Sequence, residues 1–223
     1  MSADFGLLYH QRMAQGNGVL VANAPLVWNT RLAALAAEAT TLLAADGGAN
    51  HLARLGLRPS QVIGDLDSIS GRTRAWLGED GLVLLEDQDR TDLDKALEFA
   101  FDGLGLQNVI VVAALGGRTD HDLGNLGLLA RLALGERLVY EGTNERVLAV
   151  AGEAVLACCP GEIWSFWTFD PAVRVSIEGV RWPIEDAVID AGGRPSISNE
   201  AVADRIHIRS VGGPTVVVRR YKG

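Results

Sequence analysis

The sequence predicts an α/β fold, with a parallel-sheet three-layer N-terminal domain and a smaller C-terminal antiparallel β-sandwich domain. Two observations support this prediction. Up to about residue 150, short strands that are apolar throughout alternate with amphipathic helical segments, as in a parallel sheet buried on both faces. Beyond that point, apolar and polar residues alternate with a period of two, and Gly and Pro interrupt the segments. We expect the domains to span residues 1–148 and 149–223.

Apolar runs and helical spacing predict the individual elements. Buried strands are expected at residues 19–22, 42–45, 62–63, 82–85, 109–115 and 138–140. Helices are expected at 31–40, from residue 91 onward and after residue 118. The second helix has an apolar stripe of Leu93, Ala96, Leu97, Ala100, Phe101 and Leu104, and the third carries Leu123, Leu126, Leu129 and Ala130. In the second domain, strands are expected at 174–177, 206–209 and 216–218.

The composition is typical of a folded protein. The chain has 223 residues, of which 48% are hydrophobic and 22% charged, and its net charge is −8. The acidic balance argues against a nucleic-acid partner, which would favour clustered Lys and Arg. Cys158 and Cys159 are adjacent and cannot link distant segments. No signal-peptide pattern or membrane-length apolar run is present, so we expect a cytoplasmic protein without a membrane partner.

Acidic residues follow the predicted strand at residues 62–63. Asp65 and Asp67 are two positions apart, so in an extended chain both carboxylates would point to the same side. Such a pair is repulsive unless a cation lies between the acids, and hard oxygen ligands suit Mg²⁺. A turn that uses Asp side chains for its own hydrogen bonds is equally compatible with this segment taken alone.

A second acidic group surrounds the start of the helix near residue 91. Thr91 is the predicted N-cap, and the helix dipole accounts for Asp92 and Asp94 in the first turn. It does not account for Asp87 and Asp89. A metal–phosphate site at the same sheet edge as the first acidic pair explains this surplus better.

Two basic residues are candidates for binding phosphate. Lys95 lies one turn into the second helix and could reach a phosphate oxygen, although an exposed helix lysine is the simpler alternative. Arg118 follows Gly116 and Gly117 between the apolar strand at 109–115 and a helix. Glycines at such a turn expose backbone N–H groups to an anion, and the planar guanidinium suits a phosphate.

Six short segments, taken in order, resemble the signature of the thiamine pyrophosphokinase (thiamine diphosphokinase) family. They extend from the second predicted strand almost to the carboxyl end, and their shared order is far more specific than any one of them. Residues 192–195, just before the last segment, are unusual for the family. The six segments are residues 46–50, 64–68, 87–92 with Lys95 and Ala96, 116–121, 179–183 and 196–200.

This resemblance implies a homodimeric transferase that moves the terminal diphosphate of ATP to thiamine and releases AMP. It implies Mg²⁺ as the cofactor, an α/β domain for ATP and catalysis, and a β-sandwich domain for thiamine and dimerisation. The implied metal ligands are Asp65, Asp67, Asp89 and Asp92, and the implied ATP-binding residues are Asp46, Asn50, Asp89, Thr91, Lys95 and Arg118. Thiamine would be bound by Arg118, Asp120, Trp182, Ser198 and Asn199, and the catalytic residues would be Asp65, Asp67, Asp92 and Asp120.

The chemistry of that reaction suits these residue types. The thiamine hydroxyl must approach a phosphorus atom that is already anionic, so positioning and charge stabilisation supply most of the catalysis. A carboxylate would accept the hydroxyl proton, with Asp92 or Asp120 as the candidates. Trp182 would stack on the cationic thiazolium ring, unless it is a core tryptophan.

Two other functions remain open at this stage. A related diphosphotransferase that acts on another hydroxymethyl compound, such as a pterin, would use the same acidic clusters. A noncatalytic module that binds a nucleotide or metal and regulates a partner is the second alternative. Finding Trp182, Ser198 and Asn199 remote from a pocket would favour the first alternative.

Overall fold

The computed structural model of the chain describes residues 17–221, which form two compact units. The division lies between Gly116 and Gly117, and we call the parts the first and the second unit. The boundary expected from sequence, between residues 148 and 149, falls inside strand β7 (Glu145–Ala157). That the functions of the protein divide between two domains at this boundary stays a prediction.

The first unit is built on a parallel sheet, as the sequence predicts. The strands lie in the order β5-β1-β2-β3-β4, and every pairing between them is parallel. Their apolar runs are almost wholly buried, except in the short edge strand β4. The strands are β1 (Asn17–Val21), β2 (Thr41–Ala45), β3 (Gln61–Gly64), β4 (Leu82–Leu84) and β5 (Asn108–Val112).

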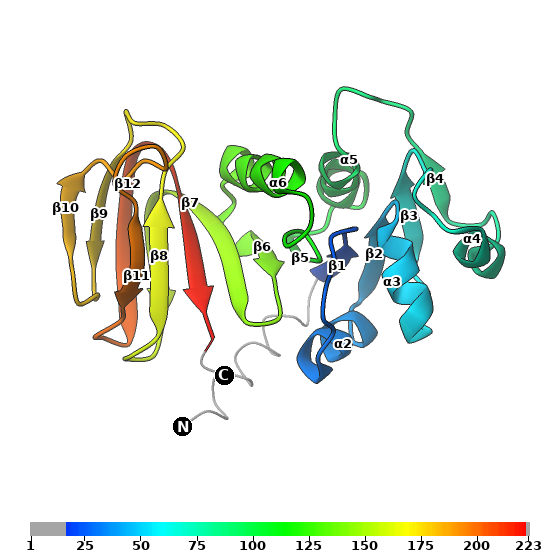
Figure 1. The fold of residues 1–223 in the computed structure, drawn as a ribbon, viewed down its shortest axis with the longest axis horizontal. Coiled ribbons are helices and arrows are strands. Elements are labelled where there is room, and N and C mark those ends of the chain that lie inside the picture. The colour runs from blue at the N-terminus through cyan, green and yellow to red at the C-terminus, as the bar shows by residue number, and fades with distance from the viewer. Residues whose placement is uncertain (1–16, 222–223) are drawn as a thin grey trace. The chain divides into compact units, whose positions relative to one another are not determined.

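Helices connect these strands on both sides of the sheet. They are α2 (Thr30–Ala37), α3 (Gly48–Leu55), α4 (Gly71–Leu77) and α5 (Asp92–Glu98), and α3 and α4 were not expected from the sequence. The chain steps outward from β1 to β4 and then returns to β5 on the other side of β1. Right-handed crossovers therefore place α5 opposite the other helices, and Figure 1 shows α3 and α5 on opposite sides of the sheet. Ligands of such sheets bind beyond the carboxyl ends of the strands, near this reversal.

The predicted helical stripes are only partly buried. Helix α5 continues as a π-helical turn, η1 (Phe99–Gly103), in which the Leu104 N–H donates to the Phe99 carbonyl. This wider turn rotates Leu104 out of the stripe, and the residue is 41% exposed. On α6 (Thr119–Leu132), Leu128, Leu129 and Ala130 are buried but Leu123 is exposed.

The second unit contains the antiparallel strands that the sequence predicts. Figure 1 shows the long strand β12 at the centre of this unit, where it replaces the two short strands expected at 206–209 and 216–218. It pairs with β7 along nearly its whole length, and successive halves of its other edge pair with β9 and β8. The elements that follow α6 are η2 (Gly135–Arg137), β6 (Leu138–Glu141), β7, β8 (Ile163–Trp167), β9 (Arg174–Glu178), β10 (Ile184–Ala187), β11 (Ser196–Glu200) and β12 (Arg205–Arg220).

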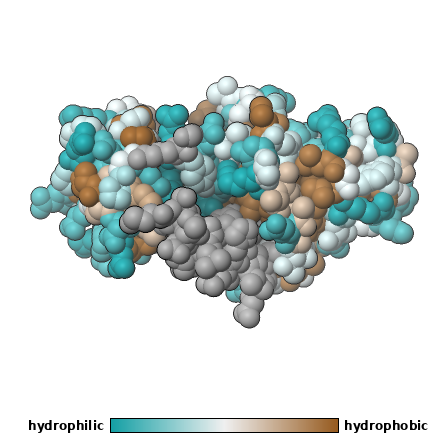
Figure 2. All heavy atoms as spheres, turned by 90° about the horizontal axis from the view of Figure 1, so that it is seen from below, coloured by the Kyte–Doolittle hydropathy of each residue, from teal (hydrophilic) through white to brown (hydrophobic). Residues whose placement is uncertain are grey.

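Strand β6, which was expected from the sequence, lies within the second unit. It pairs antiparallel with β7 through Tyr140 and Glu141. On the face in Figure 2, hydrophobic groups are scattered among hydrophilic ones over the described surface. Within residues 17–221, no helix combines the length and apolar character needed to cross a membrane.

Candidate functional site

Strained backbone marks three strand ends of the first unit. Asp46, Leu66 and Ala113 have positive φ angles of 42°, 64° and 58°, and they follow β2, β3 and β5. A left-handed conformation is unusual for residues other than Gly, and each instance costs about 1–3 kcal/mol. Such strain gathers at functional sites, and here it lies at the sheet edge where ligands of this fold bind.

Three carboxylates converge at this edge. Oxygen atoms of Asp46, Asp65 and Asp67 all lie within 4.8 Å of one another. The expectation of an extended chain between the last two is wrong, because Leu66 is left-handed and its side chain is buried. The turn at Leu66, rather than strand alternation, brings the pair together. Asp46, expected from the sequence among the ATP-binding residues, completes the group.

The charge of this cluster suits a divalent cation. Asp46 is only 4% exposed, and burial raises the pKa of its carboxyl above the usual value while a hydrogen bond from Ser68 opposes that rise. Its Oδ1 accepts from the Ser68 N–H at 3.3 Å. Three carboxylates at this spacing repel one another, and hard oxygen ligands of this kind are those that Mg²⁺ prefers. The residues present therefore fit the expected metal.

Asn50 fixes the loop that carries two of these acids. Its Nδ2 donates to the Ser68 carbonyl at 2.9 Å, and its Oδ1 accepts from the Ser70 N–H at 3.0 Å. Both ends of the amide thus bind the backbone of residues 68–70. The structure makes Asn50 a positioning residue of the acidic loop.

The Asp92 side chain adjoins the cluster by a hydrogen bond to the backbone of Asp65. Its Oδ1 accepts from the Asp65 N–H at 3.3 Å, which requires α5 to approach the end of β3 closely. Gly64 permits this approach, because a Cβ there would lie 2.9 Å from Asp92 Oδ1 and 3.0 Å from the Asp46 Cβ. Its φ of 148° also lies in the region that favours glycine.

Lys95 is buried rather than exposed. Its side chain is 2% exposed, and Nζ lies 2.8 Å from Asp92 Oδ1. Nζ also donates to the carbonyls of Leu85 and Asp87, at 3.1 and 3.0 Å. All three N–H groups have partners, so in this structure Lys95 ties the segment after β4 to α5. Its expected contact with phosphate stays a prediction.

Asp89 lies apart from the three-carboxylate cluster. It is exposed, and its N–H donates to Asp87 Oδ1 at 2.9 Å. Asp87 also bonds Arg90 at 2.7 Å, and this bond holds the pKa of the Asp87 carboxyl below its usual value. Thr91 is the N-cap of α5, as expected, because its side chain accepts from the Asp94 N–H. The proposed metal contacts of Asp89 and Asp92 and the ATP contact of Thr91 stay predictions.

Arg118 and Asp120, in the second unit, bind each other. Arg118 Nε lies 3.1 Å from Asp120 Oδ1, and both side chains are exposed. The hydrogen bond from Arg118 lowers the pKa of Asp120 to about 2. A carboxylate held ionised in this way is a weak proton acceptor, so the observed pairing does not favour Asp120 as a base. A phosphate would compete with Asp120 for the same guanidinium.

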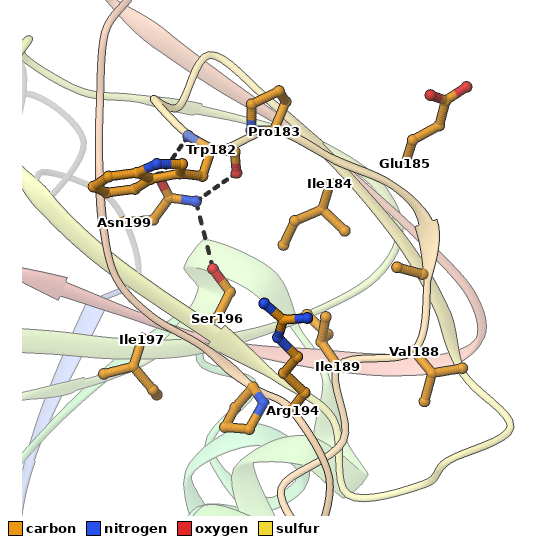
Figure 3. Close-up of a pocket in the computed structure, with 12 residues that line it drawn as sticks. Trp182, Pro183, Ile184, Glu185, Val188, Ile189, Arg194, Ser196, Ile197 and Asn199 are labelled. Atoms are coloured by element: carbon orange, nitrogen blue, oxygen red, sulfur yellow. Dashed lines mark hydrogen bonds between the residues drawn. The ribbon is translucent and has the colours of Figure 1, made fainter.

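A pocket of about 540 Å³ lies entirely within the second unit (Figure 3). Of the residues expected to bind thiamine, Trp182 and Asn199 line it, whereas Ser198, Arg118 and Asp120 are not among its described lining residues. Trp182 is 59% exposed, which rules out a core tryptophan. Sequence analysis did not identify the apolar lining or Arg194 as part of a site, and it placed Ser196 only within the segment 196–200. The other lining residues are Pro183, Ile184, Glu185, Ala187, Val188, Ile189, Pro195 and Ile197.

Asn199 is buried beneath the pocket and holds the backbone of one of its lining residues, Trp182. The residue is 2% exposed, and its Oδ1 accepts from the backbone N–H groups of Trp182 and Glu200 at 3.1 and 3.0 Å. Its Nδ2 donates to the Trp182 carbonyl at 2.7 Å (Figure 3). The Asn199 amide thus forms the hydrogen bonds that a neighbouring strand would otherwise form with the backbone of Trp182, and it holds Trp182 in place.

Replacing Asn199 by Ala is expected to lower the free energy of unfolding by about 2–3 kcal/mol. The variant leaves the backbone N–H and carbonyl of Trp182 without their partner and opens a small cavity. Thermal and urea unfolding measure the loss, and the exposed Asn144→Ala is the matched control. Equal stability of the two variants would contradict the role of Asn199.

Two family models match the chain. The thiamin pyrophosphokinase catalytic domain matches residues 32–139, and the thiamin pyrophosphokinase vitamin B1 binding domain matches residues 160–213. A thiamine pyrophosphokinase 1 of Oryza sativa subsp. japonica is 25% identical, with 84% of this chain and 78% of that protein covered. The thiamine pyrophosphokinase of Bacillus subtilis is 27% identical, with 82% and 88% covered.

Solved structures share the fold. The crystal structure of the Bacillus subtilis thiamine pyrophosphokinase superposes with a TM-score of 0.78 at 23% identity, covering 93% of this chain and 100% of that one. The yeast thiamin pyrophosphokinase gives a TM-score of 0.75 at 17% identity, with 93% and 87% covered. The mixed fold, parallel first and antiparallel later, is therefore one that solved proteins adopt.

Proposed function

Because the chain belongs to the thiamin pyrophosphokinase family, we propose that it transfers diphosphate from ATP to thiamine, giving thiamine diphosphate and AMP. One observation carries this proposal. The catalytic-domain match contains the carboxylate cluster, and the vitamin B1 match contains the Trp182 pocket. Both matches concern thiamine, so a pterin substrate and a noncatalytic role are not favoured.

The carboxylate cluster is the proposed site of Mg²⁺ and of the ATP phosphates. Asp46, Asp65 and Asp67 would hold the ion, with Asp92 and Asp89 as further expected ligands. Mg²⁺ bound there would supply positive charge that offsets the charge of the phosphates. Asn50 and Lys95 would keep the two acidic loops in place, and Arg118 would bind a phosphate once Asp120 releases it.

In the proposed reaction, the thiamine hydroxyl oxygen forms a bond to the β-phosphorus of ATP. The bond from that phosphorus to the oxygen bridging it to the α-phosphorus breaks, AMP leaves, and the hydroxyl proton is released. The chain contributes orientation of the two reactants and a site that accepts anionic charge. Asp92 stays the expected proton acceptor, and its Oδ1 lies 2.8 Å from Lys95 Nζ.

The pocket around Trp182 is the proposed thiamine site. The exposed indole offers a face for a cationic thiazolium, and Asn199 holds the indole-bearing backbone. We assign ATP binding and catalysis to residues 1–148, and thiamine binding and dimerisation to residues 149–223. The proposal includes a homodimer, as the family resemblance implies, and a cytoplasmic location, where ATP is available.

The full chain, incubated with ATP, Mg²⁺ and thiamine, is expected to form AMP and thiamine diphosphate in equal amounts. Chromatography of the nucleotides and thiamine compounds measures both products. EDTA in excess of Mg²⁺ should abolish both, and a hydroxymethylpterin in place of thiamine should yield no AMP. Formation of ADP, or of no product, would refute the proposed function.

A further inference from the structure

The pocket of the second unit contains a cationic side chain that no other group neutralises. Arg194 lines the pocket, and Figure 3 shows its guanidinium pointing inward, toward Ser196 and Ile184. Within residues 17–221, Arg194 forms no hydrogen bond or ion pair. It lies in the segment 192–195, just before strand β11.

The surrounding charges leave this guanidinium available to a ligand. Among the described residues of the lining, Glu185 is the only other charged one, and Figure 3 shows its carboxylate pointing away from the pocket. Nearby Asp190 accepts from the Gly192 N–H at 2.9 Å, and Glu200 is paired with Arg181 at 3.1 Å. The inward-facing charge of the pocket is therefore positive.

A positive pocket does not match the proposed substrate as well as it matches the product. Thiamine carries a cationic thiazolium, which Arg194 repels, whereas thiamine diphosphate adds an anionic group to the same ring system. A guanidinium is a planar fork of donors that binds phosphate oxygens in pairs. The buried Ile189 and the half-buried Ile184 in the lining lower the local dielectric and strengthen that contact.

We propose that Arg194 makes this pocket bind thiamine diphosphate more tightly than thiamine, so that the product restrains its own formation. The inference rests on the proposed function, because it takes the Trp182 pocket as the thiamine site. Arg194 contacts the diphosphate of the bound product, and Trp182 holds the rings. Product that accumulates then competes with thiamine for this pocket and lowers turnover.

The test is a calorimetric titration of the full-length protein with thiamine and with thiamine diphosphate, without ATP. The wild type is expected to bind the diphosphate at least ~10-fold more tightly, and Arg194→Gln is expected to bring the two affinities within about twofold of each other. Arg209→Gln removes the same charge from an exposed position outside the pocket lining and should keep the wild-type ratio. Inorganic diphosphate should compete with the product in the wild type only.

Two further measurements keep the inference testable if Arg194→Gln is poorly folded. Arg194→Lys retains the charge without the fork and should give an intermediate ratio, and added salt should reduce the wild-type ratio. Equal affinities in the wild type, or a ratio that Arg194→Gln leaves unchanged, would overturn the inference. A protein that forms AMP but shows either result keeps the proposed function, whereas one that forms no AMP loses that function.

Discussion

Replacing Asp67 by Asn is expected to reduce turnover of ATP and thiamine at least ~100-fold, equivalent to about 2.7 kcal/mol of transition-state stabilisation. Asn keeps the size of the side chain and an oxygen that can accept from Ser68 Oγ, which donates to Asp67 Oδ1 at 2.9 Å. It removes one of the three converging charges. The ion that offsets the phosphate charge is then held more weakly.

The stability of the same variant should move in the opposite direction. Without metal, Asp67→Asn relieves repulsion among the carboxylates, so its melting temperature should equal or exceed that of the wild type. Mg²⁺ should raise the wild-type melting temperature through linkage and affect the variant less. The exposed Asp80→Asn serves as the control and should match the wild type in both assays. Turnover within twofold of wild type would exclude Asp67 from the site.

Replacing Lys95 by Met is expected to lower the free energy of unfolding by about 2–4 kcal/mol. Met fills most of the same space, but it leaves the carbonyls of Leu85 and Asp87 and the carboxylate of Asp92 without their buried donor. For a chain of this length, that loss corresponds to a fall in melting temperature of roughly 5–15 °C. Turnover should fall as well, because the segment before α5 loses its anchor.

The stability of Lys95→Met distinguishes two roles for Lys95, which are anchoring the backbone and binding phosphate. If Lys95 served only as a phosphate ligand, the variant would raise the KM for ATP at unchanged stability. The exposed Arg72→Met removes a charge from helix α4 and is expected to leave both stability and turnover unchanged. Lys95→Met with the stability of Arg72→Met would contradict the anchoring role.

The sequence was most informative where a local rule decides the outcome. The apolar runs predicted the parallel strands because only a sheet buried on both faces accommodates them. Thr91 was identified as an N-cap because its hydroxyl can accept from the Asp94 N–H three residues later. Where a pattern depends on geometry beyond a few residues, prediction failed: the π-helical turn after α5 turned Leu104 to solvent.

The candidate site shows the same limit more sharply. Asp65 and Asp67 were recognised as a pair, but their convergence depends on a left-handed Leu66, a conformation that no sequence pattern announces. Lys95 was read as an exposed helix lysine or a phosphate ligand. Its burial depends on the segment after β4 folding over α5, which brings two carbonyls 8 and 10 residues away to Nζ.

By itself, the sequence determined the type of chemistry: strand ends rich in acids and glycines, a parallel sheet to gather them, and a family resemblance that two family models support. The tertiary structure alone decided which of those side chains bond to the backbone. Asn50, Lys95 and Asn199 have the residue types of ligand contacts, yet their polar atoms bind the chain. The physical reason is that a buried donor or acceptor must find a partner, and only the folded chain determines whether that partner is protein or ligand.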